Sequence, residues 1–401
     1  MELTPSQEQA FSTLLDRVDR GDSVIRLSGA AGTGKTTLIR ELHDALPDSV
    51  VCTPTNKAAQ VLRTKGIPAT TFYRKFYILE EATEDRRLRF ISCKRWLETN
   101  FNGALPEGKI SYAPILIIDE ATMVNTISYR EMMRMCDTLI LVGDEHQLPP
   151  VGDRENPAGL FGSEMPDATL TEVMRQAEGS QILELADAIR RSSPKVRSML
   201  GFFEPEQEFR ELIQQGVQAI CFTNNERRRI NMVARKALGL KTPWPVVGEK
   251  LIVTNNYSED LLNGTMVEIL DLEWDQIKPW AMATLDFGEG KKTCRLNMQA
   301  FSEDQVSSYR DQLEATMRAR LNSDEDLGVE TTFGYCLTAH KAQGSEWEKV
   351  VVFDQSSIVH RVQANNPSPQ MSPEEYVRRW LYTCITRARK DLFVAPTHWA
   401  R

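Results

Sequence analysis

The stretch LSGAAGTGKTTLIRELH, residues 27–43, decides the fold of this chain. It places three glycines within six positions and continues through a lysine and two threonines into a helical pattern. Gly29, Gly34, Lys35 and Thr36 meet the phosphate-loop pattern G-x-x-x-x-G-K-[ST]. Glycines permit the positive φ angles at which backbone N–H groups converge on phosphate oxygens, and the following helix adds its positive N-terminal end. The stretch therefore predicts a site for a nucleoside triphosphate.

Two acids after an apolar strand, in ILIIDEAT (residues 115–122), complete this site. Asp119 would take Mg²⁺ together with Thr36, and Glu120 would act as the general base that polarises an attacking water. Lys35 would reach the β- and γ-phosphates. The residues expected to bind nucleotide in these two segments are Gly29, Ala30, Ala31, Gly32, Thr33, Gly34, Lys35, Thr36, Thr37 and Asp119. The pattern predicts an enzyme that hydrolyses a nucleoside triphosphate.

The composition is that of a globular intracellular protein. The 401 residues favour about two to four folding units. The seven cysteines are scattered without a C-x-x-C pair, which argues against a zinc site or a disulfide framework and fits a reducing cytosol. The start MELTPSQEQA has no secretory pattern, and the apolar runs are far shorter than the ~20 residues of a membrane span. We expect a cytoplasmic protein with no membrane partner.

The charge is unevenly distributed along the chain. The net charge is −8, but residues 57–95 hold ten Lys and Arg against four acids, and residues 378–390 hold five against none. The local field decides whether a polyanion docks, so both basic segments are compatible with nucleic-acid binding. Solvated charged faces are the alternative interpretation of each segment.

Apolar strands alternate with helical patterns in two regions of the chain. In the first, helices are expected at 5–20, 35–45 and 57–65, and strands at 23–29, 49–55, 113–122 and 138–152. A second region of the same kind begins near residue 180 and resumes after residue 330. Buried parallel α/β sheets produce this alternation, and polar residues at the strand ends mark a ligand crevice. We predict an α/β fold with two parallel-sheet P-loop domains.

Two segments interrupt this alternation. Residues 76–112 are basic and lack a helix-length apolar period, which indicates an insertion into the first domain. Residues 247–300 form short β-type runs separated by turns, which indicates a small barrel inserted into the second domain.

Eight segments resemble, in order, the motifs of superfamily 1 helicases of the B type. They are GAAGTGKTT, TPTNKAAQVL, IIDEATMV, GDEHQLPPV, LTEVMRQ, FTNNERRRIN, LTAHKAQGSE and YTCITRARKDLFV. The layout resembles the Dda-type phage helicases and, more distantly, RecD-like and Pif-like enzymes. The resemblance implies RecA-like domains at 1–75 with 113–177 and at 178–246 with 328–401. It also implies a pin hairpin (domain 1B) at 76–112 and an SH3-like barrel (domain 2B) at 247–327.

The resemblance adds residues to the nucleotide site. Gln7, in LTPSQEQAF, would read the adenine, and Gln147 would sense the γ-phosphate. Arg175 and Arg387 would complete the phosphate cage, where such arginines contribute ~10³–10⁵ in rate. Gly344 and Glu346 join the nucleotide-binding set. ATP would then lie between the two domains, and its hydrolysis would open the cleft.

The resemblance also places a single-stranded DNA track across both domains. The implied DNA-binding residues are Pro54, Thr55, Asn56, Lys57, Thr71, Phe72, Thr338, His340 and Lys341. Phe90 and Phe101 are both candidates for the pin aromatic that splits the duplex. Phe72, Phe222, Trp244 and Tyr257 are candidate stacking residues. For Phe222 we favour the alternative that the ring is a core residue. For the other three rings and for His340, a core position stays an open alternative.

These features predict an ATP-driven, Mg²⁺-dependent helicase. It would move 5′→3′ along single-stranded DNA as a monomer and separate duplexes at single-strand/double-strand junctions; the direction rests on the resemblance alone. Candidate partners are replication or recombination proteins such as a single-strand-binding protein, and a phage source would put the protein in the host cytoplasm. Two alternatives stay open: a motor that remodels RNA, and a nucleotide-switched ATPase that clamps DNA without moving.

Overall fold

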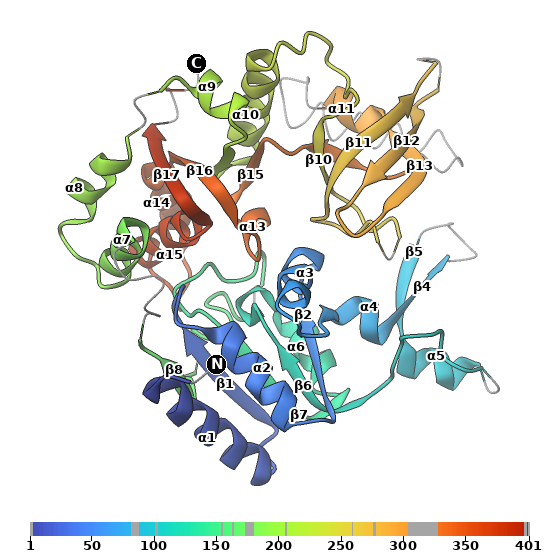
Figure 1. The fold of residues 1–401 in the computed structure, drawn as a ribbon, viewed down its shortest axis with the longest axis vertical. Coiled ribbons are helices and arrows are strands. Elements are labelled where there is room, and N and C mark those ends of the chain that lie inside the picture. Colours follow the sequence, from blue (N-terminus) through green and yellow to red (C-terminus); the bar gives the residue numbers. More distant parts are fainter. Residues whose placement is uncertain are drawn as a thin grey trace.

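The computed structural model describes residues 3–81, 88–100, 103–153, 155–162, 164–172, 180–204, 207–258, 260–275, 278–303, 328–396 and 399. They form two parallel α/β domains, an antiparallel sheet and a β-hairpin (Figure 1). Among these residues, no helix combines the length and apolar content needed to cross a bilayer.

The first domain contains a six-stranded parallel sheet in the order β3-β2-β6-β7-β1-β8. Its strands are β1 (Val24–Gly29), β2 (Ser49–Thr53), β3 (Thr70–Thr71), β6 (Ala113–Ile118), β7 (Cys136–Gly143) and β8 (Ala168–Leu170). Its helices are α1 (Pro5–Asp19), α2 (Lys35–Ala45), α3 (Asn56–Thr64), α4 (Phe72–Phe76), α6 (Thr126–Met132) and the 3-10 turn η1 (Ala121–Met123).

Both faces of this sheet are buried, as the continuous apolar runs predict. On β6, Ile117 packs into the core cluster beneath α1 and α2, whereas Leu116 and Ile118 pack into the cluster with Met132 of α6. Side chains alternate between the faces of a strand, so a buried strand must be apolar at successive positions. The helices and strands predicted for residues 5–65 and 113–143 are confirmed.

The start of α1 shows how local sequence sets an element boundary. Thr4 accepts a hydrogen bond from the Gln7 N–H, and the Gln7 Oε1 accepts one from the Thr4 N–H, which is a capping box. Pro5 occupies the first helical turn, where its missing N–H costs nothing.

The second domain contains a four-stranded parallel sheet in the order β15-β9-β16-β17. Its strands are β9 (Gln218–Cys221), β15 (Cys336–Thr338), β16 (Trp347–Asp354) and β17 (Ala388–Pro396). Its helices are α7 (Gln181–Arg190), α8 (Val196–Leu200), α9 (Phe209–Gln214), α10 (Asn224–Ala237), α13 (Ala339–Ala342), α14 (Ser356–Asn365), α15 (Pro373–Ile385) and the 3-10 turn η3 (Gly201–Phe203). This confirms the second parallel α/β unit.

The predicted barrel region forms a five-stranded antiparallel sheet in the order β13-β12-β11-β10-β14. Its elements are β10 (Lys250–Val253), β11 (Met266–Glu273), β12 (Trp280–Asp286), β13 (Lys291–Asn297), β14 (Thr331–Phe333) and α11 (Gln299–Glu303). A bridge between Leu296 and Val329 curls the sheet toward closure. Its last strand, β14, lies beyond residue 327, where the sequence prediction ended this unit.

The predicted pin segment contains an antiparallel hairpin, β4 (Tyr77–Glu81) and β5 (Leu88–Ser92), followed by α5 (Cys93–Thr99). The hairpin lies on the same side of the first domain as the antiparallel sheet (Figure 1). The pin and SH3-like assignments remain predictions.

Candidate active site

The glycine loop joins β1 to α2 at the carboxyl edge of the first sheet. Gly32 and Gly34 have φ angles of 80° and 83°, which glycine adopts without strain. A Cβ added at Gly29 would come within 2.7 Å of the Thr33 Oγ1. The backbone therefore takes the tight path on which N–H groups can converge on a phosphate.

Lys35 lies in the first turn of α2, and its amino group bonds two carbonyl oxygens of the glycine loop. Its Nζ donates to the carbonyl oxygens of Gly29 at 2.6 Å and Ala30 at 3.1 Å. No carboxylate of the described residues forms an ion pair with it. Thr36 and Thr37 follow in the same turn, so the predicted loop residues are brought together as a site for an anion.

The two acids follow β6 at the same edge of the sheet. The Asp119 N–H donates to the Cys52 carbonyl at 3.0 Å, which fixes the turn. Glu120 has a φ of 55°, a left-handed conformation that costs a non-glycine residue roughly 1–3 kcal/mol and is concentrated at functional sites. Burial raises the pKa of Asp119 to about 7, the charge of Glu120 adds to the shift, and Lys35 opposes it. A cation at this position would favour the ionised carboxylate.

The oxygen ligands present here suit Mg²⁺. Thr36 offers a hydroxyl and Asp119 a carboxylate, the hard oxygen ligands that this ion prefers. Within the part of the chain that the structure describes, no three His, Cys, Asp or Glu side chains gather as a metal cluster. The ion would therefore depend on these two side chains, water and phosphate oxygens, as is usual for Mg²⁺ with a nucleotide.

Gln7 reaches the glycine loop from α1. Its Nε2 donates to the Thr33 carbonyl at 3.3 Å, and its Oε1 belongs to the capping box. This places the predicted adenine-reading residue beside the loop, while its role in reading a base stays a prediction.

Gln147 lies in the loop after β7 and carries an unsatisfied polar atom. The side chain is 4% exposed, and its Oε1 is buried without a hydrogen-bond partner among the described residues. Such an atom costs about 1–3 kcal/mol unless it finds a partner. This unpaired oxygen is an acceptor, so it suits a donor such as the attacking water, whereas a phosphate contact of the predicted sensor would have to come from its Nε2.

The second domain forms hydrogen bonds to both backbone groups of Leu148, the residue after Gln147. The Leu148 N–H donates to the Thr383 Oγ1 at 2.9 Å, and the Gln343 Nε2 donates to the Leu148 carbonyl at 2.8 Å. Thr383 lies on α15, and Gln343 follows α13. The predicted sensor is thus positioned by the opposite domain.

Arg387 is a buried cation whose side chain bonds three oxygens of its own domain. Its side chain donates to the Thr383 carbonyl, the Ser345 carbonyl and the Thr386 Oγ1 at 3.1–3.3 Å. The residue is 3% exposed and forms no ion pair with any described carboxylate. A buried charge is costly until an anion meets it, which fits the predicted phosphate contact. Arg175 lies outside the described residues.

Gly344 lies against a side chain of the first domain, whereas Glu346 pairs within the second domain. Gly344 has a φ of 71°, and an added Cβ would lie 3.0 Å from the Thr55 Oγ1 of the first domain. Glu346 is exposed and pairs with Arg389 at 2.9 Å. Its predicted nucleotide contact has no support from this geometry.

Sequence reasoning missed Tyr382 and Asp144. The Tyr382 hydroxyl donates to the Asp144 Oδ2 at 2.6 Å and accepts the Ala31 N–H at 3.0 Å. Tyr382 lies in the quoted segment YTCITRARKDLFV, but only the arginine of that segment was assigned a role. The signal that could have pointed to Tyr382 is its polar hydroxyl within residues 380–385, all of which are buried.

The first predicted DNA segment lies between β2 and α3. Thr55 caps α3 by accepting the Ala58 N–H at 3.2 Å, and Pro54 precedes it. The Asn56 side chain donates to the Thr265 Oγ1 of the antiparallel-sheet unit at 3.4 Å, and Lys57 is exposed. These residues surround the start of α3, and helix N-termini favour phosphate groups.

The structure corrects the stacking role predicted for Phe72. Its ring is 1% exposed and packs against Phe76 and Tyr77, so it belongs to the core rather than to a stacking surface. Thr71 is also buried and caps α4 through the Arg74 N–H. The five-residue helix α4 is too short for its sequence to reveal which face is buried.

The two pin candidates do not lie at a described hairpin tip. Phe90 pairs with Leu79 within the hairpin, and its ring lies 5.3 Å from that of Tyr73. Phe101 lies outside the described residues. The residues between the strands, 82–87, also lie outside them, and their sequence ATEDRR has no aromatic residue. Phe90 therefore lies at the middle of the hairpin and packs against Tyr73 of α4.

The last predicted DNA segment runs from Thr338 into α13. Burial lowers the pKa of His340 to about 4, and its Nε2 lies 3.2 Å from the Tyr376 hydroxyl. Burial and the nearby Arg227 lower the pKa of Lys341 to about 8. His340 is thus a neutral, packed histidine, as the alternative interpretation allowed. The candidate stacking residues Phe222, Trp244 and Tyr257 are partly buried against the cores.

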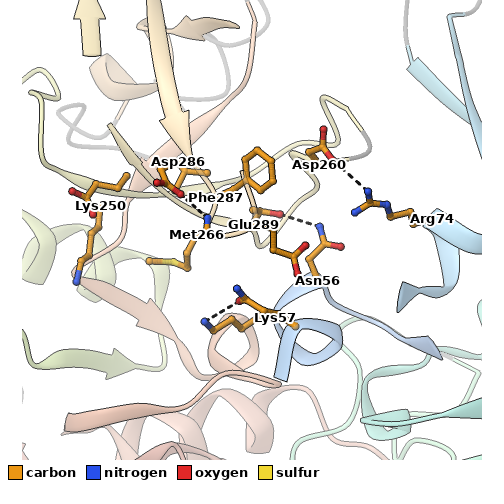
Figure 2. Close-up of a pocket in the computed structure, with 14 residues that line it drawn as sticks. Asn56, Lys57, Arg74, Lys250, Asp260, Met266, Asp286, Phe287 and Glu289 are labelled. Carbon is orange, nitrogen blue, oxygen red and sulfur yellow. Dashed lines mark hydrogen bonds and ion pairs between the residues drawn. The ribbon is translucent and has the colours of Figure 1, made fainter. Parts of the chain in front are cut away.

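A cavity of about 330 Å³ separates α3 from the antiparallel sheet. Its lining includes Asn56, Lys57 and Lys250 as well as several acids (Figure 2). Ion pairs cross it: Arg74 lies 3.6 Å from Asp260, and Arg63 pairs with Glu289. Basic side chains beside the predicted DNA segment are therefore held by carboxylates of the antiparallel-sheet unit.

Family models match both ends of the chain. The AAA domain model matches residues 2–211, which is more than half of the chain, and the UvrD-like helicase C-terminal domain model matches residues 333–395.

Two characterised relatives match nearly the whole chain. One is the ATP-dependent RecD2 DNA helicase of Deinococcus radiodurans, at 24% identity over 97% of this chain and 49% of the relative, so the chain spans about half of its length. The other is the ATP-dependent DNA helicase dda of Enterobacteria phage T4, at 22% identity over 98% and 99%.

Solved structures share the fold. Pif1 helicases studied at forked double-stranded DNA superpose with a TM-score of 0.57 at 18% identity, covering 98% of this chain and 92% of theirs. The Bacteroides Pif1 helicase in complex with ADP-AlF3 and single-stranded DNA superposes with a TM-score of 0.55 at the same identity and coverage.

Proposed function

Since this chain belongs to the superfamily 1 helicases of the B type, we propose that it is an ATP-dependent DNA helicase that moves 5′→3′ along single-stranded DNA. The proposal rests on the hydrogen bonds between the second domain and the loop after β7. Thr383 and Gln343 bond both backbone groups of Leu148, next to Gln147. A phosphate bound at the glycine loop can therefore influence the position of the second domain.

The protein groups have separate roles in this mechanism. The glycine-loop N–H groups and Lys35 bind the β- and γ-phosphates, and Glu120 orients and deprotonates the attacking water. Gln147 contacts the transferring phosphoryl group, and Arg387 stabilises the charge that develops on it. We propose the same role for Arg175, which lies outside the described residues. Bound Mg²⁺, held by Thr36 and Asp119, would neutralise phosphate charge. Gln7 would bind the base.

Hydrolysis then alters the contacts between the two domains. The predicted DNA residues that keep this role come from both: Pro54, Thr55, Asn56 and Lys57 from the first, and Thr338 and Lys341 from the second. Opening and closing of the cleft would change the spacing between the two sets of contacts and move the strand. Contacts to phosphate and sugar tolerate every sequence, which a motor requires.

The test is unwinding of a duplex that carries either a 5′ or a 3′ single-stranded tail, with and without ATP. We expect strand separation with ATP and the 5′ tail, and none from the Lys35→Ala variant, which should retain DNA binding. Unwinding from the 3′ tail would refute the direction. Stronger stimulation of ATP hydrolysis by poly-U than by poly-dT would favour an RNA track, and steady turnover without unwinding would favour a non-translocating clamp.

A further inference from the structure

Tyr382 joins two elements of the first domain from a helix of the second. Its hydroxyl accepts the N–H of Ala31 in the glycine loop and donates to Asp144 at the end of β7. Asp144 is 1% exposed and Tyr382 is 2% exposed, so water cannot readily replace either bond.

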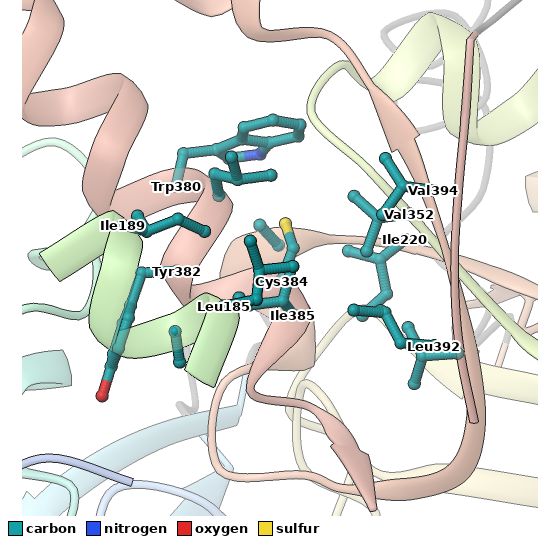
Figure 3. Close-up of a cluster of buried hydrophobic side chains, with 14 of the residues drawn as sticks. Leu185, Ile189, Ile220, Val352, Trp380, Tyr382, Cys384, Ile385, Leu392 and Val394 are labelled. Carbon is teal, nitrogen blue, oxygen red and sulfur yellow. The ribbon is translucent and has the colours of Figure 1, made fainter. Parts of the chain in front are cut away.

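The tyrosine ring is well placed to fix this geometry. It packs in the core cluster of α7 and α15, and its hydroxyl points away from the other labelled side chains of that cluster (Figure 3). The ring of His146 lies 6.0 Å from it in an edge-on arrangement. The apolar body therefore anchors the side chain in the second domain while the oxygen reaches the first.

The same end of α15 anchors Arg387. The arginine Nε donates back to the carbonyl of Thr383, the residue after Tyr382. The Thr383 Oγ1 meanwhile accepts the Leu148 N–H beside Gln147. The loop residue Ala31, the neighbour of Gln147 and the side chain of Arg387 are thus bonded to two consecutive residues of one helix.

We propose that Tyr382 is a positioning residue for ATP hydrolysis, setting the guanidinium of Arg387 against the glycine loop when the domains close. The inference rests on the proposed function. Tyr382 acts through Arg387 in the transition state, whereas the glycine loop itself binds the nucleotide in the ground state. Loss of the hydroxyl therefore lowers kcat and leaves KM for ATP nearly unchanged.

The experiment is a double-mutant cycle with Tyr382→Phe and Arg387→Ala, measured as DNA-stimulated ATP hydrolysis under multiple- and single-turnover conditions. In the wild-type background, Tyr382→Phe should lower kcat about tenfold or more, because hydrogen bonds to a charged group are the stronger ones. In the Arg387→Ala background, it should cause little further loss. Binding of a fluorescent ADP analogue and the melting temperature serve as controls for nucleotide binding and folding.

Two outcomes would overturn the inference: equal losses in both backgrounds, or a raised KM with unchanged kcat. If Tyr382→Phe does not fold, Thr383→Val removes the neighbouring contact to Leu148 and should give the same non-additive pattern. A wild-type protein that hydrolyses no ATP would instead refute the proposed function, so the two failures are distinguishable.

Discussion

Neutralising Asp260 and Glu289 together should strengthen binding of single-stranded DNA. In the structure, Asp260 pairs with Arg74 at 3.6 Å and with Lys292 at 3.7 Å, and Glu289 pairs with Arg63. Both arginines belong to the first domain: Arg63 lies on α3, which begins in the predicted DNA segment, and Arg74 lies on α4, whose start Thr71 caps. A DNA phosphate must compete with these carboxylates, so the Asp260→Asn/Glu289→Gln variant removes the competitor without removing a cation.

The expected gain in DNA affinity follows from how exposed the two arginine–carboxylate ion pairs are. Their four side chains are 32–40% exposed, and pairs of this kind contribute about 0.2–1 kcal/mol each. Two pairs give ~0.4–2 kcal/mol, which corresponds to a roughly 2- to 30-fold lower Kd. The dependence of log K on log salt should also steepen by up to ~1.4, since each arginine freed for a phosphate adds ~0.7 on a single strand.

The assay is fluorescence anisotropy of a labelled oligo-dT at several salt concentrations. Glu155→Gln is the matched control, because it breaks an exposed pair with Arg130 of α6, at 2.6 Å, which lies outside both basic segments. It should leave affinity and salt slope unchanged. Unchanged or weaker binding by the double variant would refute the idea that these carboxylates compete with DNA.

Three further predictions concern single groups. Arg235→Met should lower the free energy of unfolding in urea by about 3–5 kcal/mol, because it leaves Glu249 buried and unpaired; wild-type stability would contradict this. Glu120→Gln should abolish steady ATP turnover while the Kd for oligo-dT stays within about twofold, since the side chain acts on water and not on DNA; retained turnover would remove it from the mechanism. Affinity for DNA should fall between pH 7 and 9, because Lys341, with a pKa of about 8, loses its proton and its attraction for phosphate over that range. The DNA affinity of the Lys341→Arg variant should not change over this pH range. An equal pH dependence in that variant would assign the effect to another group.

The nucleotide loop was predictable because its chemistry is local. The glycines, Lys35 and Thr36 lie within eight positions, and each has a backbone or charge requirement that the sequence displays. The alternation of apolar strands and helices likewise predicted both parallel sheets, since burial on two faces demands continuous apolar runs.

Side-chain direction and long-range contacts were not predictable. Phe72 stands at the position that the family resemblance assigns to DNA contact, yet it points into the core from a helix of five residues. Tyr382 meets Ala31 across 351 positions of sequence, and no local pattern pairs them. Residues whose roles depend on the closing of two domains are visible only when both domains are in place.

The contact between Gly344 and Thr55 has a mechanical consequence. Thr55, at the start of α3, lies against Gly344, after α13, and a Cβ at position 344 would come within 3.0 Å of the Thr55 Oγ1. A methyl group there would press on this side chain, at a backbone φ of 71° that favours glycine. Gly344→Ala would thus load the seam between the two domains beside the start of α3 while leaving Lys35 and the two acids after β6 in place.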